Sequence, residues 1–226
     1  ETAAPATAVA KRPHRAILSE ADLVELLRRM DAAPLVAFEA ECIGDEPMSA
    51  RLVGLSFAFE REAAYLPLAH DYPGAPQQID PAAALRILKP WLERDDRQKV
   101  SEDVKLLCHV LANQGVRLAG FAHDTLLESY VFEVHERHDL GALALRHCGW
   151  TLLGYDEVTG KGAARIPFSS VEIARATEYA AGKIDCVLAL HELLFERIQK
   201  DEKLAFVYGK IEMPALPVLF RMERNG

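Results

Sequence analysis

Three strand-like segments in a row constrain the fold of this chain most. Residues 35–41, 50–59 and 63–68 are rich in apolar and aromatic side chains, and short turns separate them. This spacing favours an antiparallel meander. Short strands at 98–102 and 116–121 then alternate with helices, which indicates an α/β fold with a mixed sheet.

Helix signals fill the remainder of the chain. Ser19 is placed to cap a first helix that carries Leu23, Leu26 and Leu27, and Pro81 opens a second. The later helices are predicted over 103–115, near 124–133, over 139–147 with Asp139 as cap, over 170–200, and from Pro214 onward. The stretch 149–168 is turn-rich, and Gly54 in the second strand predicts a bulge or close packing.

Size and composition point to one domain. The chain has 226 residues, half of them apolar, and a net charge of −8, which argues against a free-standing nucleic-acid binder. The four cysteines form no CxxC pair, which favours a reducing cytoplasm, and we expect no membrane span. Residues 1–16 are interpreted as a linker or disordered start, and the chain as a piece of a longer protein.

Two acids stand at alternate positions after an apolar run, in VAFEAE. Alternation by two places Glu39 and Glu41 on one face of a strand, where they either hold a metal or mark a solvated strand end. Two weaker patterns are also present. His135, His138, His147 and Cys148 lack the spacing of a zinc finger, and Lys161 between Gly160 and Gly162 is more typical of a turn than of a phosphate loop.

Several segments together resemble the 3′–5′ proofreading exonuclease domain of bacterial DNA polymerase I. They are FEAE, RLVGLSFAFE, YLPLAHDYPGAPQQ, VSEDVKLLCHVLANQGVRLAGFAHDTLLESYVFE, RHDLGALALRHCG, TGKG, YAAGKIDCVLALH and IEMPALPVLFRMERNG. The resemblance covers nearly the whole chain from about residue 20. It implies a ribonuclease-H-like (DnaQ-like) fold with helices on both faces of the sheet, an exonuclease-like domain over 17–213, and the start of a connection to a polymerase domain over 214–226.

The family's catalytic motifs are where the resemblance fails. The D-x-E motif corresponds to Glu39 and Glu41, and the acid of the second motif is replaced by Leu107, four residues after Asp103. The third motif, Y-x-x-x-D, begins at Tyr179 and ends in Lys183. We expect Lys183 to act as an internal counter-ion for Glu39 and Glu41, and binding of Mg²⁺ or Mn²⁺ to be lost.

Other positions carry over from the family individually. Arg137 and Tyr155 match residues that contact the single strand, Tyr179 matches the tyrosine that orients the attacking water, and Asp45 replaces an apolar wedge. Asp185 follows Lys183 by two, which turns it to another face of the helix. Asp103 is the acid placed to rescue a single-metal site, if it reaches inward.

The resulting hypothesis is a vestigial, catalytically inactive exonuclease-like domain of a DNA polymerase I active in replication and repair. Its remaining role is that of a structural platform for the C-terminal polymerase domain of the same chain, with DNA reached through the full-length protein. We expect a monomeric isolated domain in the bacterial cytoplasm, associated with the nucleoid. The alternatives are a weakly active metal-dependent exonuclease that uses Glu39, Glu41 and Asp103, and a non-cleaving module that binds single-stranded DNA.

Overall fold

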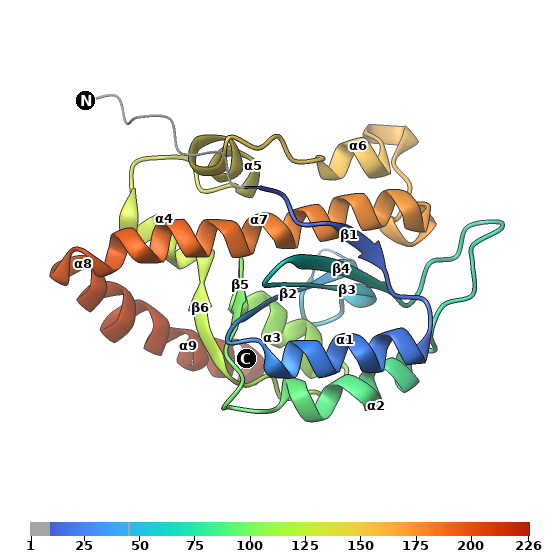
Figure 1. Cartoon of the computed structure of the whole chain (residues 1–226), viewed down its shortest axis with the longest axis horizontal. Helices are drawn as coiled ribbons and strands as arrows, with labels where there is room; N and C mark the ends of the chain where they lie inside the picture. The colour runs from blue at the N-terminus through green and yellow to red at the C-terminus, as the bar shows by residue number, and fades with distance from the viewer. Residues whose placement is uncertain (1–9, 45) are drawn as a thin grey trace.

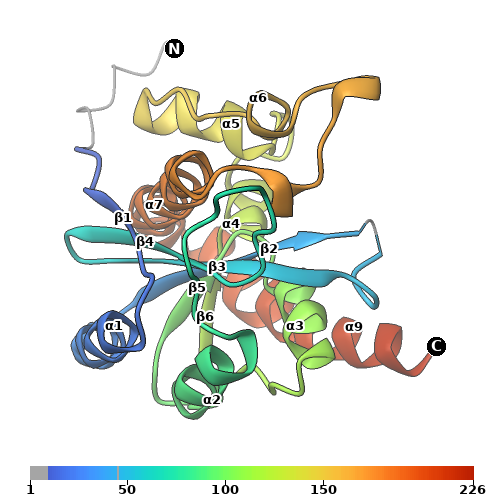
Figure 2. The same ribbon diagram turned by 90° about the vertical axis from the view of Figure 1, so that its right-hand side faces the viewer.

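The computed structural model describes residues 10–44 and 46–226. A central sheet runs through the molecule, and Figures 1 and 2 show α4, α5, α6 and α7 on one of its faces, with α1, α2 and α3 on the other. This is the α/β arrangement with a mixed sheet and helices on both faces that the sequence predicts.

The sheet has six strands in the order β1-β4-β3-β2-β5-β6. The strands are β1 His14–Ala16, β2 Val36–Ile43, β3 Arg51–Phe59, β4 Glu62–Pro67, β5 Lys99–Ser101 and β6 Phe121–Asp124. Strands β2, β3 and β4 pair antiparallel, which confirms the predicted meander. The pairs β1–β4, β2–β5 and β5–β6 are parallel.

Several helices begin directly after a capping side chain. Their bounds are α1 Glu20–Ala32, α2 Pro81–Leu92, α3 Val104–Asn113, α4 Thr125–Phe132, α5 Leu140–Leu143, α6 Tyr155–Thr159, α7 Ile173–Gln199, α8 Glu202–Val207 and α9 Met213–Asn225. Ser19 and Asp139 each accept a hydrogen bond from a backbone N–H of the first turn, as predicted, and Asp80 does the same for the helix that Pro81 opens. Short 3₁₀ or π turns are η1 Ala144–Cys148, η2 Gly162–Ala164, η3 Phe168–Ser170 and η4 Tyr208–Glu212.

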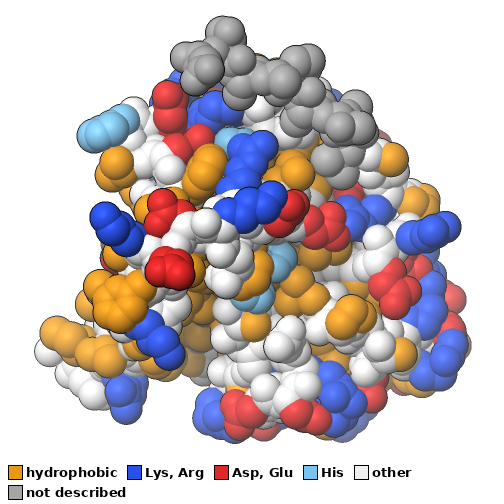
Figure 3. All heavy atoms as spheres, turned by 60° about the vertical axis from the view of Figure 1, so that its left-hand side comes forward, with side chains coloured by type: hydrophobic (Ala, Val, Ile, Leu, Met, Phe, Trp, Pro, Cys, Tyr) orange, Lys and Arg blue, Asp and Glu red, His pale blue; other side chains and the backbone are white. Residues whose placement is uncertain are grey.

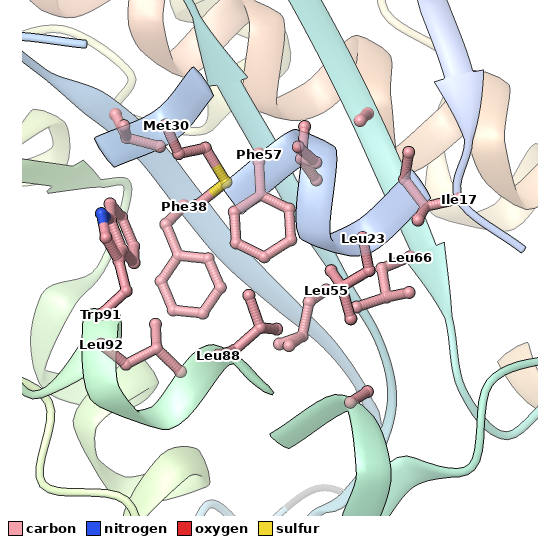
Figure 4. Packing of buried hydrophobic residues seen from close by; sticks show 14 of the residues in the cluster. Ile17, Leu23, Met30, Phe38, Leu55, Phe57, Leu66, Leu88, Trp91 and Leu92 are labelled. Atoms are coloured by element: carbon pink, nitrogen blue, oxygen red, sulfur yellow. The ribbon is translucent and has the colours of Figure 1, made fainter. Parts of the chain in front are cut away.

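Two separate apolar layers hold the helices to the sheet. On one face, the rings of Phe38 and Phe57 stack with centroids 5.0 Å apart beneath α1 and α2 (Figure 4). On the other face, the strands contribute small residues, Ala37, Ala58 and Ala63, to the layer that packs on α7. Because small side chains allow a close approach, the long helix α7 packs across β2, β3 and β4 and carries Lys183 to the acids of β2.

Both features expected at Gly54, a bulge and close packing, are present. The register between β2 and β3 shifts between Glu41 and Cys42, opposite Gly54. A Cβ atom at Gly54 would lie 2.2 Å from the hydroxyl oxygen of the buried Tyr65. Only a glycine therefore fits between the strand and this ring.

Two sequence-based boundaries require correction. Within the stretch 1–16 interpreted as a linker, His14–Ala16 forms strand β1, because the backbone pairs with β4; residues 1–9 lie outside the described part. The strand predicted at 116–121 is instead Phe121–Asp124, since Gly120 turns the chain with φ +74° just before the pairing with β5 begins.

The helix predicted from Pro214 onward is present as α9 and continues the helical segment before it. The chain is helical from Glu202 to Asn225 through α8, η4 and α9, and Pro214 lies in the first turn of α9. Among the described residues, no helix combines the length and apolar character that crossing a membrane requires.

Candidate active site

The two acids of the VAFEAE segment lie side by side on one face of β2, as the alternation predicts. Glu39 pairs with Ser56 and Glu41 with Gly54 across the β2–β3 ladder, and each acid is only 6% exposed. They are therefore buried, and the interpretation as a solvated strand end is wrong.

Glu39 is held by the end of the neighbouring parallel strand. Its Oε1 accepts a short hydrogen bond from the Ser101 hydroxyl and a second from the backbone N–H of Glu102 at 2.8 Å. Both donors come from the point where β5 ends beside β2. The protein itself therefore supplies hydrogen bonds to this carboxylate.

Lys183 approaches the acids from α7. Its Nζ lies 3.7 Å from Oε1 of Glu41 and 3.8 Å from Oε2 of Glu102, and its side chain is 22% exposed. These separations describe ion pairs rather than hydrogen bonds. The expected pairing with Glu41 is present, whereas the second carboxylate within 4 Å is Glu102 and not Glu39.

The electrostatics of this pocket favour a charged lysine. Burial lowers the pKa of Lys183, but the carboxylates of Glu41, Glu39 and Glu102 outweigh it and raise that pKa well above its ordinary value. Burial raises the pKa of Glu41, against the opposing effect of Lys183, and raises the pKa of Glu102 to about 7. The pocket contains three carboxyl groups and one ammonium group.

Glu102 is the residue that the sequence reasoning missed. It follows β5 directly, and β5 pairs in parallel with β2, so the end of β5 meets the acid-bearing part of β2. An acid directly after a predicted neighbouring parallel strand is the signal that would have found it.

Leu107 and Asp103 lie near the pocket without contributing a ligand atom at its centre. Leu107 is 2% exposed and packs in the apolar layer beneath the sheet. Asp103 caps α3 and accepts from the backbone N–H of Leu106 at 3.0 Å. Because it precedes the helix, Asp103 does not share a helical face with Leu107, and the inward reach considered for it is not observed.

Tyr179, on the same helix as Lys183, belongs to an aromatic group. Its ring lies 5.6 Å from that of Phe168 and 6.0 Å from that of Tyr155, which begins α6. Burial raises the pKa of the Tyr179 hydroxyl. The structure thus brings Tyr155 and Tyr179 together at one edge of the pocket.

The remaining predicted residues lie apart. Arg137 is exposed and pairs with Asp139 at 2.9 Å. Asp185 is fully buried on another face of α7, where it pairs with Arg12 at 2.8 Å, as its offset from Lys183 predicts. Asp45 lies outside the described residues.

The histidine and cysteine pattern near residue 140 does not converge. His135 is exposed, His138 contacts the Ser129 hydroxyl at 3.0 Å, and His147 contacts Glu133 at 2.8 Å. Cys148 is buried in the layer beneath α7. Lys161 lies in a turn in which both flanking glycines have positive φ, as expected.

Comparison with known proteins identifies the family. A profile of the family described as 3′–5′ exonuclease matches residues 14–200, most of the chain. The chain belongs to this family. As an exonuclease-family domain, it is 42% identical over 214 residues to DNA polymerase I of Pseudomonas aeruginosa and 36% identical over 235 residues to DNA polymerase I of Rhizobium leguminosarum. These alignments cover 93% and 94% of this chain but only 23% of either polymerase.

Solved structures support the same fold for this exonuclease-family domain. The polymerase-domain structure of Pol1 from M. smegmatis with primer-template DNA and dNTP superposes with a TM-score of 0.70 at 19% identity, over 92% of this chain and 31% of that one. At such identity the likeness shows the fold alone. Together with the family match, it establishes the expected ribonuclease-H-like, DnaQ-like architecture.

Proposed function

We propose that this domain is an exonuclease-like part of a DNA polymerase I that has lost metal-dependent cleavage and serves as a platform for the polymerase domain. The observation that carries the proposal is the position of Lys183, whose ammonium lies within 4 Å of both Glu41 and Glu102. A positive group beside these acids opposes the binding of the dications that hydrolysis by two metals needs.

The fit of a metal pair to these residues is poor for two physical reasons. A dication about 4 Å from an ammonium is repelled by roughly 8 kcal/mol at an effective dielectric of about 20. The side chain of Leu107 offers no oxygen, and hard cations such as Mg²⁺ need several oxygen ligands. Glu39 is already held by two protein donors. No hydrolytic step is therefore assigned to this pocket.

The last helix supports a role as a platform. Glu223 of α9 is held to α3 by Lys105 at 2.5 Å and by His109 at 2.8 Å. The same helix leaves Val218, Leu219 and Met222 between 43% and 63% exposed. We propose that these apolar side chains contact the polymerase domain, with 17–213 as the exonuclease-like unit and 214–226 as the start of the connection.

Contact with DNA then comes through the full-length polymerase on the bacterial nucleoid. On the face in Figure 3, the Lys and Arg side chains are interspersed with Asp and Glu, which disfavours a continuous phosphate-binding track. Fluorescence anisotropy with single-stranded oligonucleotides tests this point, and we expect weak or absent binding. Tight, salt-sensitive binding would favour the non-cleaving DNA-binding alternative.

A nuclease assay tests the loss of cleavage. The chain is incubated with 3′-labelled single-stranded DNA and Mg²⁺ or Mn²⁺, alongside Glu41→Ala and the triple variant Glu39→Asp, Leu107→Asp, Lys183→Asp. We expect no degradation by the first two proteins and recovered cleavage by the triple variant if the scaffold persists. Metal-dependent 3′–5′ degradation by the unmodified chain that Glu41→Ala abolishes would reject the proposal.

A weakly active exonuclease is the second candidate, and Glu102 favours it. With Glu39 and Glu41, this residue adds a third carboxyl group to the pocket, in place of the Asp103 considered from sequence. A single Mn²⁺ would then have to displace the ammonium of Lys183. Calorimetric titration with Mn²⁺ separates the two candidates, because binding that Glu102→Gln weakens would support activity with one metal.

A further inference from the structure

A second group of polar side chains converges away from the candidate active site, between the edge strand β6 and three helical segments. His123 lies near the end of β6, Glu128 lies on α4, His191 on α7 and Tyr208 at the start of η4. One ligand atom from each of His123, Glu128 and His191 lies within 4.8 Å of the other two. No function described above uses these residues.

The distances centre on one carboxylate oxygen. Oε1 of Glu128 lies 2.8 Å from Nδ1 of His191, 3.1 Å from the hydroxyl of Tyr208 and 3.7 Å from Nδ1 of His123. The Tyr208 hydroxyl lies 3.5 Å from Nδ1 of His123. Ligands of a tetrahedral ion with bonds of about 2.0–2.1 Å are about 3.3–3.5 Å apart, so small side-chain adjustments suffice.

A buried carboxyl group lies at the centre of this cluster. Glu128 is fully buried, and its Oε2 has no hydrogen-bond partner among the described residues. In the described part of the chain, the two imidazoles are the groups that can carry positive charge within 4 Å of its carboxylate. A neutral imidazole is the form that binds metal.

We propose that His123, Glu128 and His191 bind a structural Zn²⁺-type divalent ion, with the hydroxyl oxygen of Tyr208 as fourth ligand. Two imidazole nitrogens and a carboxylate oxygen are a donor set that zinc accepts. The Tyr208 oxygen already accepts from the backbone N–H of Asp124 at 3.0 Å, which orients it toward the group. The side chain of His123 is 15% exposed and provides a route of entry.

Such an ion would join segments that are far apart in the sequence. It ties the sheet edge to α4 and α7, and through Tyr208 to the helical segment 202–225 whose outer side we assign to the polymerase domain. Because the group shares no residue with Glu39, Glu41 and Lys183, this inference stands or falls separately from the proposed loss of cleavage.

Metal binding is tested on the full chain after chelator treatment. Co²⁺ serves as probe, because tetrahedral Co²⁺ absorbs visible light, and Zn²⁺ then competes with it while the melting temperature is recorded. The variants are His123→Phe, which keeps a ring of similar size, and Glu128→Gln, which keeps the shape and a hydrogen-bonding group. His138→Phe is the matched control, since that histidine lies outside the group. Circular dichroism verifies that each variant is folded.

We expect one Co²⁺ per chain with tetrahedral absorption, displacement by Zn²⁺, and a rise in melting temperature that EDTA reverses. His123→Phe and Glu128→Gln should each weaken Co²⁺ binding about 10–100-fold, while His138→Phe leaves it unchanged. Absence of stoichiometric binding by the unmodified chain would overturn the proposal. So would binding that His123→Phe leaves intact, or loss in a Glu41→Gln variant, which would place the ion in the other pocket.

Discussion

Replacing Lys183 by methionine tests the electrostatic arrangement of the candidate active site most directly. Methionine is unbranched and about as long as the apolar stem of lysine, and it lacks the ammonium. The carboxyl groups of Glu41 and Glu102 then face each other without their cation, with side-chain exposures of 7% and 22%. We expect the variant to fold with a lower free energy of unfolding.

The distances set the magnitude. Each ion pair at 3.7 and 3.8 Å is worth about 4.5 kcal/mol at an effective dielectric of about 20, which makes roughly 9 kcal/mol for both. Burying the ammonium costs several kcal/mol in the intact protein, and in the variant the acids relieve part of their repulsion by taking up protons. The net loss should be about 2–4 kcal/mol at pH 8, and smaller at pH 5.

Urea unfolding at both pH values measures this loss. Lys161→Ala is the control, because Lys161 pairs with Asp156 at a similar 3.9 Å while its side chain is 78% exposed. That surface pair should contribute less than about 1 kcal/mol. A Lys183→Met protein as stable as Lys161→Ala at pH 8 would refute the counter-ion role and mean that the ammonium is solvated.

Three further predictions concern stability. The folded-state pKa of Glu102 is about 7 against an ordinary 4.5, so the folded protein binds this proton more tightly than the unfolded chain does. The free energy of unfolding should therefore fall by up to about 3 kcal/mol as pH rises from 4.5 to 8. The variant Glu102→Gln should flatten this dependence on pH. Gly54→Ala should cost about 1–3 kcal/mol in urea unfolding because its Cβ would overlap the buried Tyr65 hydroxyl, whereas Gly209→Ala, with open space around it, should be neutral or slightly stabilising. Lys99→Met should cost about 3 kcal/mol, because the buried Nζ donates to three backbone carbonyls at 2.8–3.1 Å; thermal melting equal to that of the unmodified chain would contradict this reasoning.

Much of the fold followed from local patterns. Strand alternation predicted the shared face of Glu39 and Glu41. The cap residues Ser19 and Asp139 and the proline Pro81 marked helix starts, and Gly54 marked a close contact. Strand β1 and the shifted β6 were missed. Their few residues carry no period of their own, and pairing with neighbouring strands defines them.

For the candidate site, too, some features followed from the sequence and others only from the tertiary structure. Sequence by itself determined the types of residue at the motif positions. Two glutamates are present, but a leucine and a lysine stand at the other two positions where the family has acids. The tertiary structure decided that Lys183 pairs with Glu41 and Glu102, that Asp103 caps a helix, and that His123, Glu128 and His191 converge. Residue spacing fixes the face of an element on which a side chain lies, but the register between strands and the packing of α7 on the sheet determine which faces meet.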